Sequence, residues 1–176
     1  MPLDVDSASV AGVWWRHIPG GGEVHYRAPH PADGRWQRGA VVEALYFADS
    51  PETAWAEWYR FLAEFALRPT EQMPRDLWRW RVTLPRVADL RGFRRLQRVG
   101  LQVPPPGRAG WGPFQQVGEA LHREGWPALI APSAARPDVG RILCVLRTTR
   151  IVAGVRPVPP PRRLRKPPAP PTGMRT

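Results

Sequence analysis

A strand followed at once by a helix is the strongest structural signal in this sequence, and it limits the folds open to the chain. Residues Glu43–Ala48 (EALYFA) form a short apolar run, which is typical of a buried strand. Ser50 and Pro51 then favour the start of a helix. Serine caps a helix N-terminus well, and proline at the first helical position gives up no hydrogen bond. We expect this helix to run to about Leu67.

The expected helix has one apolar face, because its large apolar residues recur at three- and four-residue steps. These residues are Ala54, Trp55, Trp58, Phe61, Leu62 and Phe65. At 100° per residue, Glu57 lies roughly 100° from the centre of that face, at its border. Glu64 is a second border charge, seven positions further on. A carboxylate at such a border either lines a cleft or extends into water, and periodicity alone leaves both readings open.

The rest of the chain predicts several short strands and a second helix, and hence a single domain of the α+β class. Strands are predicted at 13–18, 77–84, 87–90, 128–131 and 142–146, and a helix from Pro113 to Arg123. Within 77–84 (LWRWRVTL), apolar residues alternate with polar ones, as in a strand with one buried face. Residues 1–12 are predicted to be flexible and 13–154 to form the domain. Residues 155–176, with eight prolines, are predicted to be a Pro/Arg-rich disordered tail.

Composition excludes several classes of protein. Cys144 is the single cysteine, so no internal disulfide can form. The first residues lack the basic and apolar regions of a secretory signal, and no apolar run approaches the ~18 residues of a membrane span. The four histidines have no cysteine or acidic partners at zinc-binding spacing, so no metal site is predicted. We therefore expect a cytoplasmic protein without membrane contact.

The formal net charge of +11 raises the question of nucleic-acid binding. Of the 26 basic residues, 25 are arginine and only Lys166 is lysine, a bias that genome base composition can also produce. Six of these residues follow residue 154, where there are no acids, which leaves residues 1–154 with a net charge of +5. The body of the chain is therefore only mildly basic, and an enzyme that holds a pyrophosphate would need positive potential as well.

Four polar residues fall in a suggestive order along the chain. Arg35, Tyr46 and Glu57 follow one another at intervals of eleven positions, in a loop, a strand and a helix, and Ser133 follows the apolar run ALIAP far downstream. The segments GRW, LYFADSPETAWAE and LIAPSAAR, which carry these residues, closely resemble the RES domain family. WWRHIP, with Arg16, resembles that family's opening strand, and VADL and FQQVGEALHREGW fit its middle. The resemblance covers about Val13 to Leu146, and QRG after GRW departs from the family pattern.

The resemblance implies a fold and a reaction. RES (Arg-Glu-Ser) proteins are NAD-consuming toxins of RES/Xre type II toxin–antitoxin systems. The implied fold is a mixed β-sheet core with flanking helices, similar to ADP-ribosyltransferases, with NAD bound as substrate in a cleft. The implied reaction breaks the bond between nicotinamide and ribose, with inorganic phosphate or water as acceptor, as in an NAD phosphorylase or glycohydrolase. No metal is implied. Because nicotinamide leaves as a neutral ring, one carboxylate can suffice where ordinary glycosidases use two.

The resemblance also implies roles for individual residues. Glu57 would stabilise the developing positive charge on the sugar and hold the ribose hydroxyls. Arg35 would grip a phosphate with its planar guanidinium, and Arg16 would assist it. Tyr46 would pack its ring against nicotinamide or ribose. Ser133 would supply a hydroxyl either to the nicotinamide amide or to orient Glu57.

Partners and rival functions stay open at the level of sequence. The resemblance implies a helix-turn-helix (Xre-type) antitoxin, so that nucleic acid would be reached only through that partner, and a homo-oligomer is left open. One alternative is an ADP-ribosyltransferase that acts on a protein target. Another is a non-enzymatic Arg/Trp-rich module that binds nucleic acid through salt-dependent contacts.

Overall fold

Six strands form one mixed sheet at the centre of the computed structural model, which describes residues 2–105 and 107–175. The strands are β1 (Asp6–Pro19), β2 (Glu43–Ala48), β3 (Arg75–Asp89), β4 (Ala128–Pro132), β5 (Arg141–Arg147) and β6 (Val155–Leu164). Their order is β1-β2-β5-β4-β3-β6, and β1 also pairs with β3, so the first five close into a ring. The β3–β4 pairing is parallel and the others are antiparallel. The predicted α+β class with a mixed sheet is confirmed.

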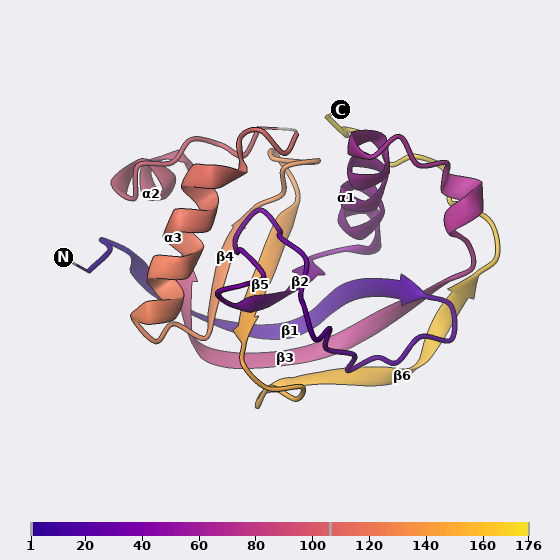
Figure 1. The fold of residues 1–176 in the computed structure, drawn as a ribbon, viewed down its shortest axis with the longest axis horizontal. Helices are drawn as coiled ribbons and strands as arrows, with labels where there is room; N and C mark the ends of the chain where they lie inside the picture. The colour runs from indigo at the N-terminus through magenta and orange to yellow at the C-terminus, as the bar shows by residue number, and fades with distance from the viewer. Residues whose placement is uncertain (1, 106, 176) are drawn as a thin grey trace.

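Helices cover the sheet at two separate places (Figure 1). They are α1 (Pro51–Glu64), α2 (Phe93–Arg98) and α3 (Trp111–Arg123), with a short 3-10 turn, η1, at Pro69–Gln72. In Figure 1, α2 and α3 lie together near the N-terminus, whereas α1 lies on the other side, near the C-terminus. The long strands β1 and β3 run below the helices, and β6 lies along β3 on the α1 side. No helix in the described part of the chain is long and apolar enough to cross a membrane.

The strand–helix unit at 43–64 forms largely as its sequence predicts. Strand β2 has the predicted limits, and the Ser50 hydroxyl accepts a hydrogen bond from the Thr53 N–H, with Pro51 opening the helix. The helix ends at Glu64 and not at Leu67, because Ala66 has a positive φ of 50° and the chain turns there. The Leu67 N–H then bonds back to the Leu62 carbonyl, which closes the last turn.

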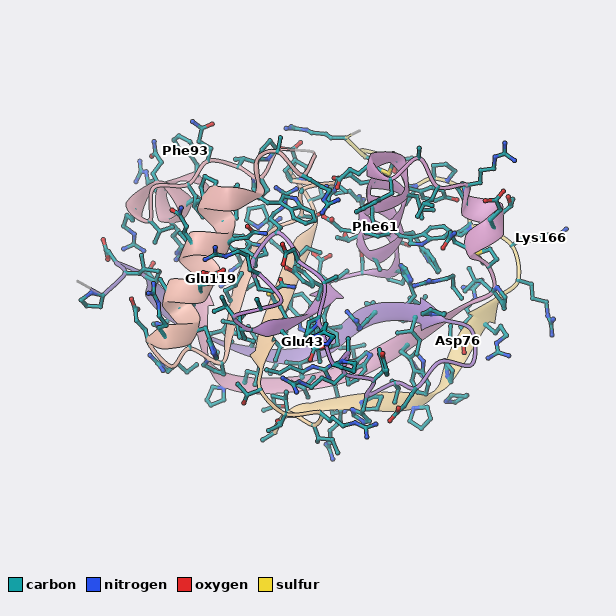
Figure 2. All side chains as sticks on the ribbon, in the orientation of Figure 1. Glu43, Phe61, Asp76, Phe93, Glu119 and Lys166 are labelled. Atoms are coloured by element: carbon teal, nitrogen blue, oxygen red, sulfur yellow. The ribbon has the colours of Figure 1, made fainter. Side chains whose placement is uncertain are left out.

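The apolar face of α1 is only partly buried. Ala54, Trp55, Trp58 and Leu62 are buried as predicted. Phe61 and Phe65 are 43% and 38% exposed, and their rings pack on each other with centroids 4.7 Å apart. The prediction was wrong for these two residues, which stay partly exposed although the Arg108 guanidinium lies 4.7 Å from the centre of the Phe65 ring. Phe61 instead lines the large cavity described below, and Figure 2 marks its place at α1.

The strands bury side chains on both faces of the sheet. Alternate residues of the ring strands, such as Leu45, Phe47 and Val145, form one core with Trp80 of β3. The opposite face, with Ala44 and Cys144, packs against α2 and α3 in a second core. Cys144 is fully buried, and burial raises the pKa of its thiol far above the usual value. It serves as a core residue, as the sequence indicates.

Strand β3 is one long strand where the sequence predicts two, at 77–84 and 87–90. It runs without a break from Arg75 to Asp89 and pairs with β1 along nearly its whole length. The predicted alternation is confirmed at its centre, where Trp80, Val82 and Leu84 are buried and the residues that alternate with them, Arg79, Arg81 and Thr83, are exposed.

Both ends of the chain are more ordered than the sequence predicts. Residues 1–12 were expected to be flexible, but β1 begins at Asp6 and pairs with β3 from Asp89 onward. Residues 155–176 were expected to be disordered, but Val155–Leu164 form β6, which pairs with β3. Strand β6 lies at the end of the sheet order, where proline can be tolerated because one edge needs no N–H donors. The domain therefore extends past both predicted boundaries, 13 and 154.

The described residues after Leu164 contain no helix or strand, yet they contact the body of the protein. They pass Lys166 at the outer edge of the molecule (Figure 2) and then return towards α1. The Tyr59 hydroxyl donates to the Pro168 carbonyl. The Arg175 N–H donates to the Ala135 carbonyl at 2.8 Å, and the Arg175 guanidinium pairs with Asp138 at 3.0 Å.

Candidate active site

One cavity of about 460 Å³ opens between α1, β1, β2 and the loop before β2. Four of the five predicted site residues line it, namely Arg16, Arg35, Tyr46 and Glu57. The fifth, Ser133, is fully buried behind the wall and contacts the cavity through Glu57. Much of the remaining lining is aromatic, with Trp15, Trp36, Trp58, Phe61 and Trp111. The fold thus brings together polar groups from five separate segments.

Glu57 is an ionised carboxylate with both oxygens engaged. Its side chain is 23% exposed, at the border of the buried face as predicted. Oε1 accepts hydrogen bonds from Ser133 Oγ at 2.6 Å and from the Ala135 N–H at 3.1 Å, and Oε2 accepts from Arg60 Nη2 at 3.0 Å. Burial acts to raise the pKa of Glu57, but Arg60 and these hydrogen bonds outweigh it and hold the pKa below its usual value.

Ser133 stands where β4 ends and serves as a support for Glu57. Its hydroxyl donates to Glu57 and accepts from the Arg136 N–H at 3.0 Å, while its own N–H donates to the Gly140 carbonyl. The single hydroxyl proton is therefore used in the bond to Glu57. Of the two roles expected for Ser133, this geometry favours the orientation of Glu57 over contact with a nicotinamide amide.

Arg35 lines the cavity, and its terminal nitrogens are unpaired among the described residues. Its side chain is only 6% exposed, and both terminal guanidinium nitrogens are buried without a hydrogen-bond partner among the described residues. The guanidinium lies 5.4 Å from the centre of the Phe114 ring. Burial, followed by the nearby charge of Arg60, lowers the pKa of Arg35 to about 10, so it stays charged at neutral pH. A buried cation with free donors in a cavity wall is suited to bind an anion.

Tyr46 holds the loop that carries Arg35. Its hydroxyl accepts a hydrogen bond from the Trp36 N–H at 3.0 Å and donates to Gln37 Oε1. The Gln37 amide in turn donates to the Ala32 carbonyl at 3.3 Å. The loop also needs Gly34, because a Cβ there would lie 2.5 Å from the Tyr46 hydroxyl. Gln37 is the first residue of the QRG that departs from the family pattern, and it takes a direct part in holding the loop.

Arg16 lies in β1 and lines the same cavity half-buried. Its Nη1 donates to the Tyr46 carbonyl at 3.0 Å, which ties the β1 side chain to β2. Burial, together with repulsion from Arg147 and Arg75, lowers the pKa of Arg16 to about 10. Arg16 therefore adds positive charge to the wall while one of its nitrogens stays bound to backbone.

Two polar residues of the site were missed by sequence reasoning. Gln37 gives no local signal, because its partner Tyr46 lies in another element. Arg60 gives one, since it stands three residues after Glu57 and four before Glu64, the spacings at which helix side chains meet. Glu64 was expected to be a simple border charge, but it pairs with Arg60 and is only 11% exposed. Across residues 2–105 and 107–175, no group of three or more His, Cys, Asp and Glu side chains gathers as a metal site would require.

Comparison with known proteins places this geometry in context. A family model described as the RES domain matches residues 13–166. Among solved structures, a chain in the crystal structure of the M. tuberculosis MbcT–MbcA toxin–antitoxin complex is similar, with a TM-score of 0.75 and 19% sequence identity. The match covers 90% of this chain and 87% of that one. No curated protein matches the sequence. At this level of identity, the structural likeness concerns the fold.

Proposed function

Since the chain belongs to the RES domain family, we propose that it is an NAD-consuming enzyme that cleaves the bond between nicotinamide and ribose. One observation carries the proposal. A carboxylate held ionised by three donors, Glu57, shares a cavity with an arginine whose guanidinium has no partner among the described residues, Arg35. NAD carries a positively charged nicotinamide ring bonded to ribose, and a negatively charged pyrophosphate. The carboxylate of Glu57 suits the first feature, and the guanidinium of Arg35 suits the second.

The chemistry follows from the charges. As the bond between the ribose C1′ and the nicotinamide nitrogen breaks, its electron pair passes to the ring, which leaves neutral. Positive charge develops on the sugar, and the carboxylate of Glu57 stabilises it. The interaction is stronger in a partly buried cavity than in bulk water, because the effective dielectric constant is lower there. An oxygen of phosphate or of water then bonds to C1′, and when water is the acceptor it releases one proton to the solvent. No acid is needed for the leaving group, so a single carboxylate suffices.

The other site residues complete the proposed substrate site. Arg35 binds a phosphate oxygen of NAD with its fork of N–H donors, and Arg16 adds positive potential on the β1 side. The ring of Tyr46 forms part of the wall near nicotinamide or ribose, while its hydroxyl is used in the loop. Ser133 orients Glu57 from behind the wall.

Phosphate is the proposed acceptor in preference to water. The cavity holds Arg16, Arg35 and Arg60 in its lining, and such an excess of arginine favours a second anion beside the pyrophosphate. No metal is part of the proposed mechanism. Purified protein should release nicotinamide from NAD, and mass spectrometry of the second product identifies the acceptor. ADP-ribose phosphate supports phosphorolysis, plain ADP-ribose supports hydrolysis, and an absence of nicotinamide counts against the function.

A toxin–antitoxin pair is the proposed biological setting. The similar solved structure is that of a toxin–antitoxin complex, and consumption of NAD would be toxic to the producing cell. A helix-turn-helix antitoxin would be the partner, and nucleic acid would be bound only through it. Because the substrate is a cytoplasmic metabolite, we place the protein in the cytoplasm. Expression of the chain alone should lower cellular NAD and stop growth, and co-expression of a cognate antitoxin should restore both.

The two rival functions predict different results. A protein ADP-ribosyltransferase would also release nicotinamide, but it would transfer mass to a protein and leave no free ADP-ribose or ADP-ribose phosphate. A nucleic-acid-binding module would use the Arg/Trp strand as a stacking surface. Trp80 is only 2% exposed, so its ring is not available for stacking. Salt-dependent binding of DNA or RNA that survives loss of Glu57 would favour this second rival.

A further inference from the structure

We infer that Arg60 is a positioning residue for the reaction, because it fixes one oxygen of Glu57 and is itself fixed by Glu64. The inference rests on the proposed function, in which Glu57 faces the developing positive charge. It adds two residues, Arg60 and Glu64, to the site that the sequence suggested.

The contacts of Arg60 show a side chain held at several points. It is 8% exposed and lines the cavity. Its Nε and Nη2 reach the same oxygen, Glu57 Oε2, at 3.3 Å and 3.0 Å, and its Nη1 pairs with Glu64 Oε1. Glu64 Oε1 also accepts from the Gly107 N–H at 3.1 Å, in the loop that leads to α3. Arg60 therefore cannot turn towards the cavity without losing its contacts to both Glu57 and Glu64.

These contacts fix the orientation of the Glu57 carboxylate. Ser133 and the Ala135 N–H hold Oε1, and Arg60 holds Oε2, so rotation about the last side-chain bond is blocked from both sides. The terminal torsion of a glutamate is otherwise broad. Because a misplacement of about 1 Å can cost ~100-fold in rate, holding both oxygens matters for the chemistry.

Glu64 also decides how much of the negative potential of Glu57 reaches the cavity. Arg60 alone would form a closed ion pair with Glu57 and cancel the charge that the substrate needs. Glu64 shares the guanidinium, so part of the Glu57 charge stays available to the cavity. The charged groups around Glu57 are then Arg60 and Glu64 from α1, Asp33 and Arg35 from the loop before β2, and Arg16 from β1, with hydrogen bonds from the segment after β4.

The test compares Arg60→Gln and Arg60→Lys with Arg68→Gln, an exposed arginine that pairs with the exposed Glu71. The kcat and KM for NAD are measured as a function of pH. We expect Arg60→Gln to lower kcat about tenfold or more with KM within roughly threefold, and to move the acid limb of kcat to higher pH. Arg60→Lys should recover part of kcat, because it restores the charge but not the double contact. Arg68→Gln should match the wild type.

A titration separates this inference from the proposed function. The carboxyl carbon of Glu57 is followed by ¹³C NMR against pH without substrate, so no turnover is needed. A higher pKa of Glu57 in the Arg60 variants than in Arg68→Gln supports the inference even if the wild type releases no nicotinamide, a result that would defeat only the proposed function. An unchanged pKa and an unchanged kcat in folded Arg60→Gln overturn the inference.

If Arg60→Gln does not fold, Arg60→Lys and Glu64→Gln decide. Glu64→Gln leaves Arg60 to pair with Glu57 alone, so we expect a lower kcat and an acid limb moved to lower pH, opposite to the shift in Arg60→Lys. Both variants behaving as the wild type would overturn the inference.

Discussion

Ser133 Oγ donates a hydrogen bond of 2.6 Å to Glu57 Oε1 across 76 residues of sequence. The bond joins the end of β4 to the middle of α1, two elements that are far apart in the sequence. The same oxygen accepts the Ala135 N–H, so the segment after β4 gives Glu57 one side-chain donor and one backbone donor. The carboxylate is thereby aimed by a part of the protein that is itself fully buried at Ser133.

Glu57→Gln should abolish most NAD cleavage. The change keeps the shape of the side chain but removes the charge, and loss of one electrostatic contact in a preorganised site commonly costs on the order of 100-fold in rate. Nicotinamide release measures it, and thermal melting checks the fold. Glu52→Gln, an exposed carboxylate on the same helix, is the control. Glu64 is unsuitable as a control because it pairs with Arg60. Equal turnover in the two folded variants would remove Glu57 from the mechanism.

Ser133→Ala should lower kcat about tenfold and leave KM nearly unchanged, because the residue aims Glu57 without lining the cavity. The hydroxyl also helps to keep the pKa of Glu57 low. Its loss raises that pKa, so activity should be lost at a higher pH as the solution is acidified. The pH profile of kcat tests the shift, and Ser9→Ala, at an exposed position of β1, is the control. A profile that coincides with the control would contradict the orienting role.

Arg35→Lys should weaken NAD binding although it keeps the charge. The flat guanidinium can contact two phosphate oxygens, whereas an ammonium acts as a point charge. We expect kcat/KM for NAD to fall about tenfold or more. Arg79→Lys, at an exposed position of β3, should leave kcat/KM unchanged. If Arg35→Lys also does so, Arg35 does not contact the phosphates.

Tyr46→Phe separates two uses of this residue. The ring stays in the wall, but the Trp36 N–H and Gln37 lose the hydroxyl that holds the Arg35 loop. We expect a lower kcat/KM for NAD and faster hydrogen exchange at the Trp36 amide. Wild-type kinetics with unchanged exchange would mean that the ring alone matters.

Removal of residues 165–176 should leave a folded, active protein, whereas a chain ending at Gly154 should be much less stable. The shorter chain lacks β6, which pairs with β3, and the buried side chain of Val155. We estimate a loss of about 3 kcal/mol or more in the free energy of unfolding, or roughly 10 °C in Tm. Equal melting temperatures for the two truncations would show that β6 adds no stability.

Local chemistry made part of the fold predictable. The limits of β2 and the start of α1 follow from an apolar run, Ser50 and Pro51, all adjacent in sequence. The alternation in β3 is likewise local. Strand β6 escaped prediction because its prolines favour disorder until the long edge of β3 is present to pair with it. The exposure of Phe61 and Phe65 depends on what covers α1, which periodicity cannot tell.

The candidate site was likewise predictable only in part. The family resemblance supplied Arg16, Arg35, Tyr46, Glu57 and Ser133, and the fold brings the first four to one cavity with Ser133 behind it. The Ser133–Glu57 bond is one of the two roles that the resemblance implied for Ser133. The Tyr46–Gln37 bond could not be predicted, because it joins a strand to a loop whose shape the sequence does not show. Arg60 was the exception, since its spacing from both glutamates is visible in the sequence.

The backbone N–H and the carbonyl of Ala135 each form a hydrogen bond, and this bears on where a fusion partner should be attached. Its N–H donates to Glu57 and its carbonyl accepts from Arg175, so Ala135 links the segment at Arg175 to the proposed catalytic carboxylate. Any affinity tag or fluorescent partner joined there would emerge beside the cavity. The other terminus lies near α3, where the Leu3 N–H bonds to Glu124, on the opposite side of the molecule from α1 (Figure 1). Fusions are therefore best placed at the N-terminus, and a C-terminal tag alone could lower turnover in an otherwise intact enzyme.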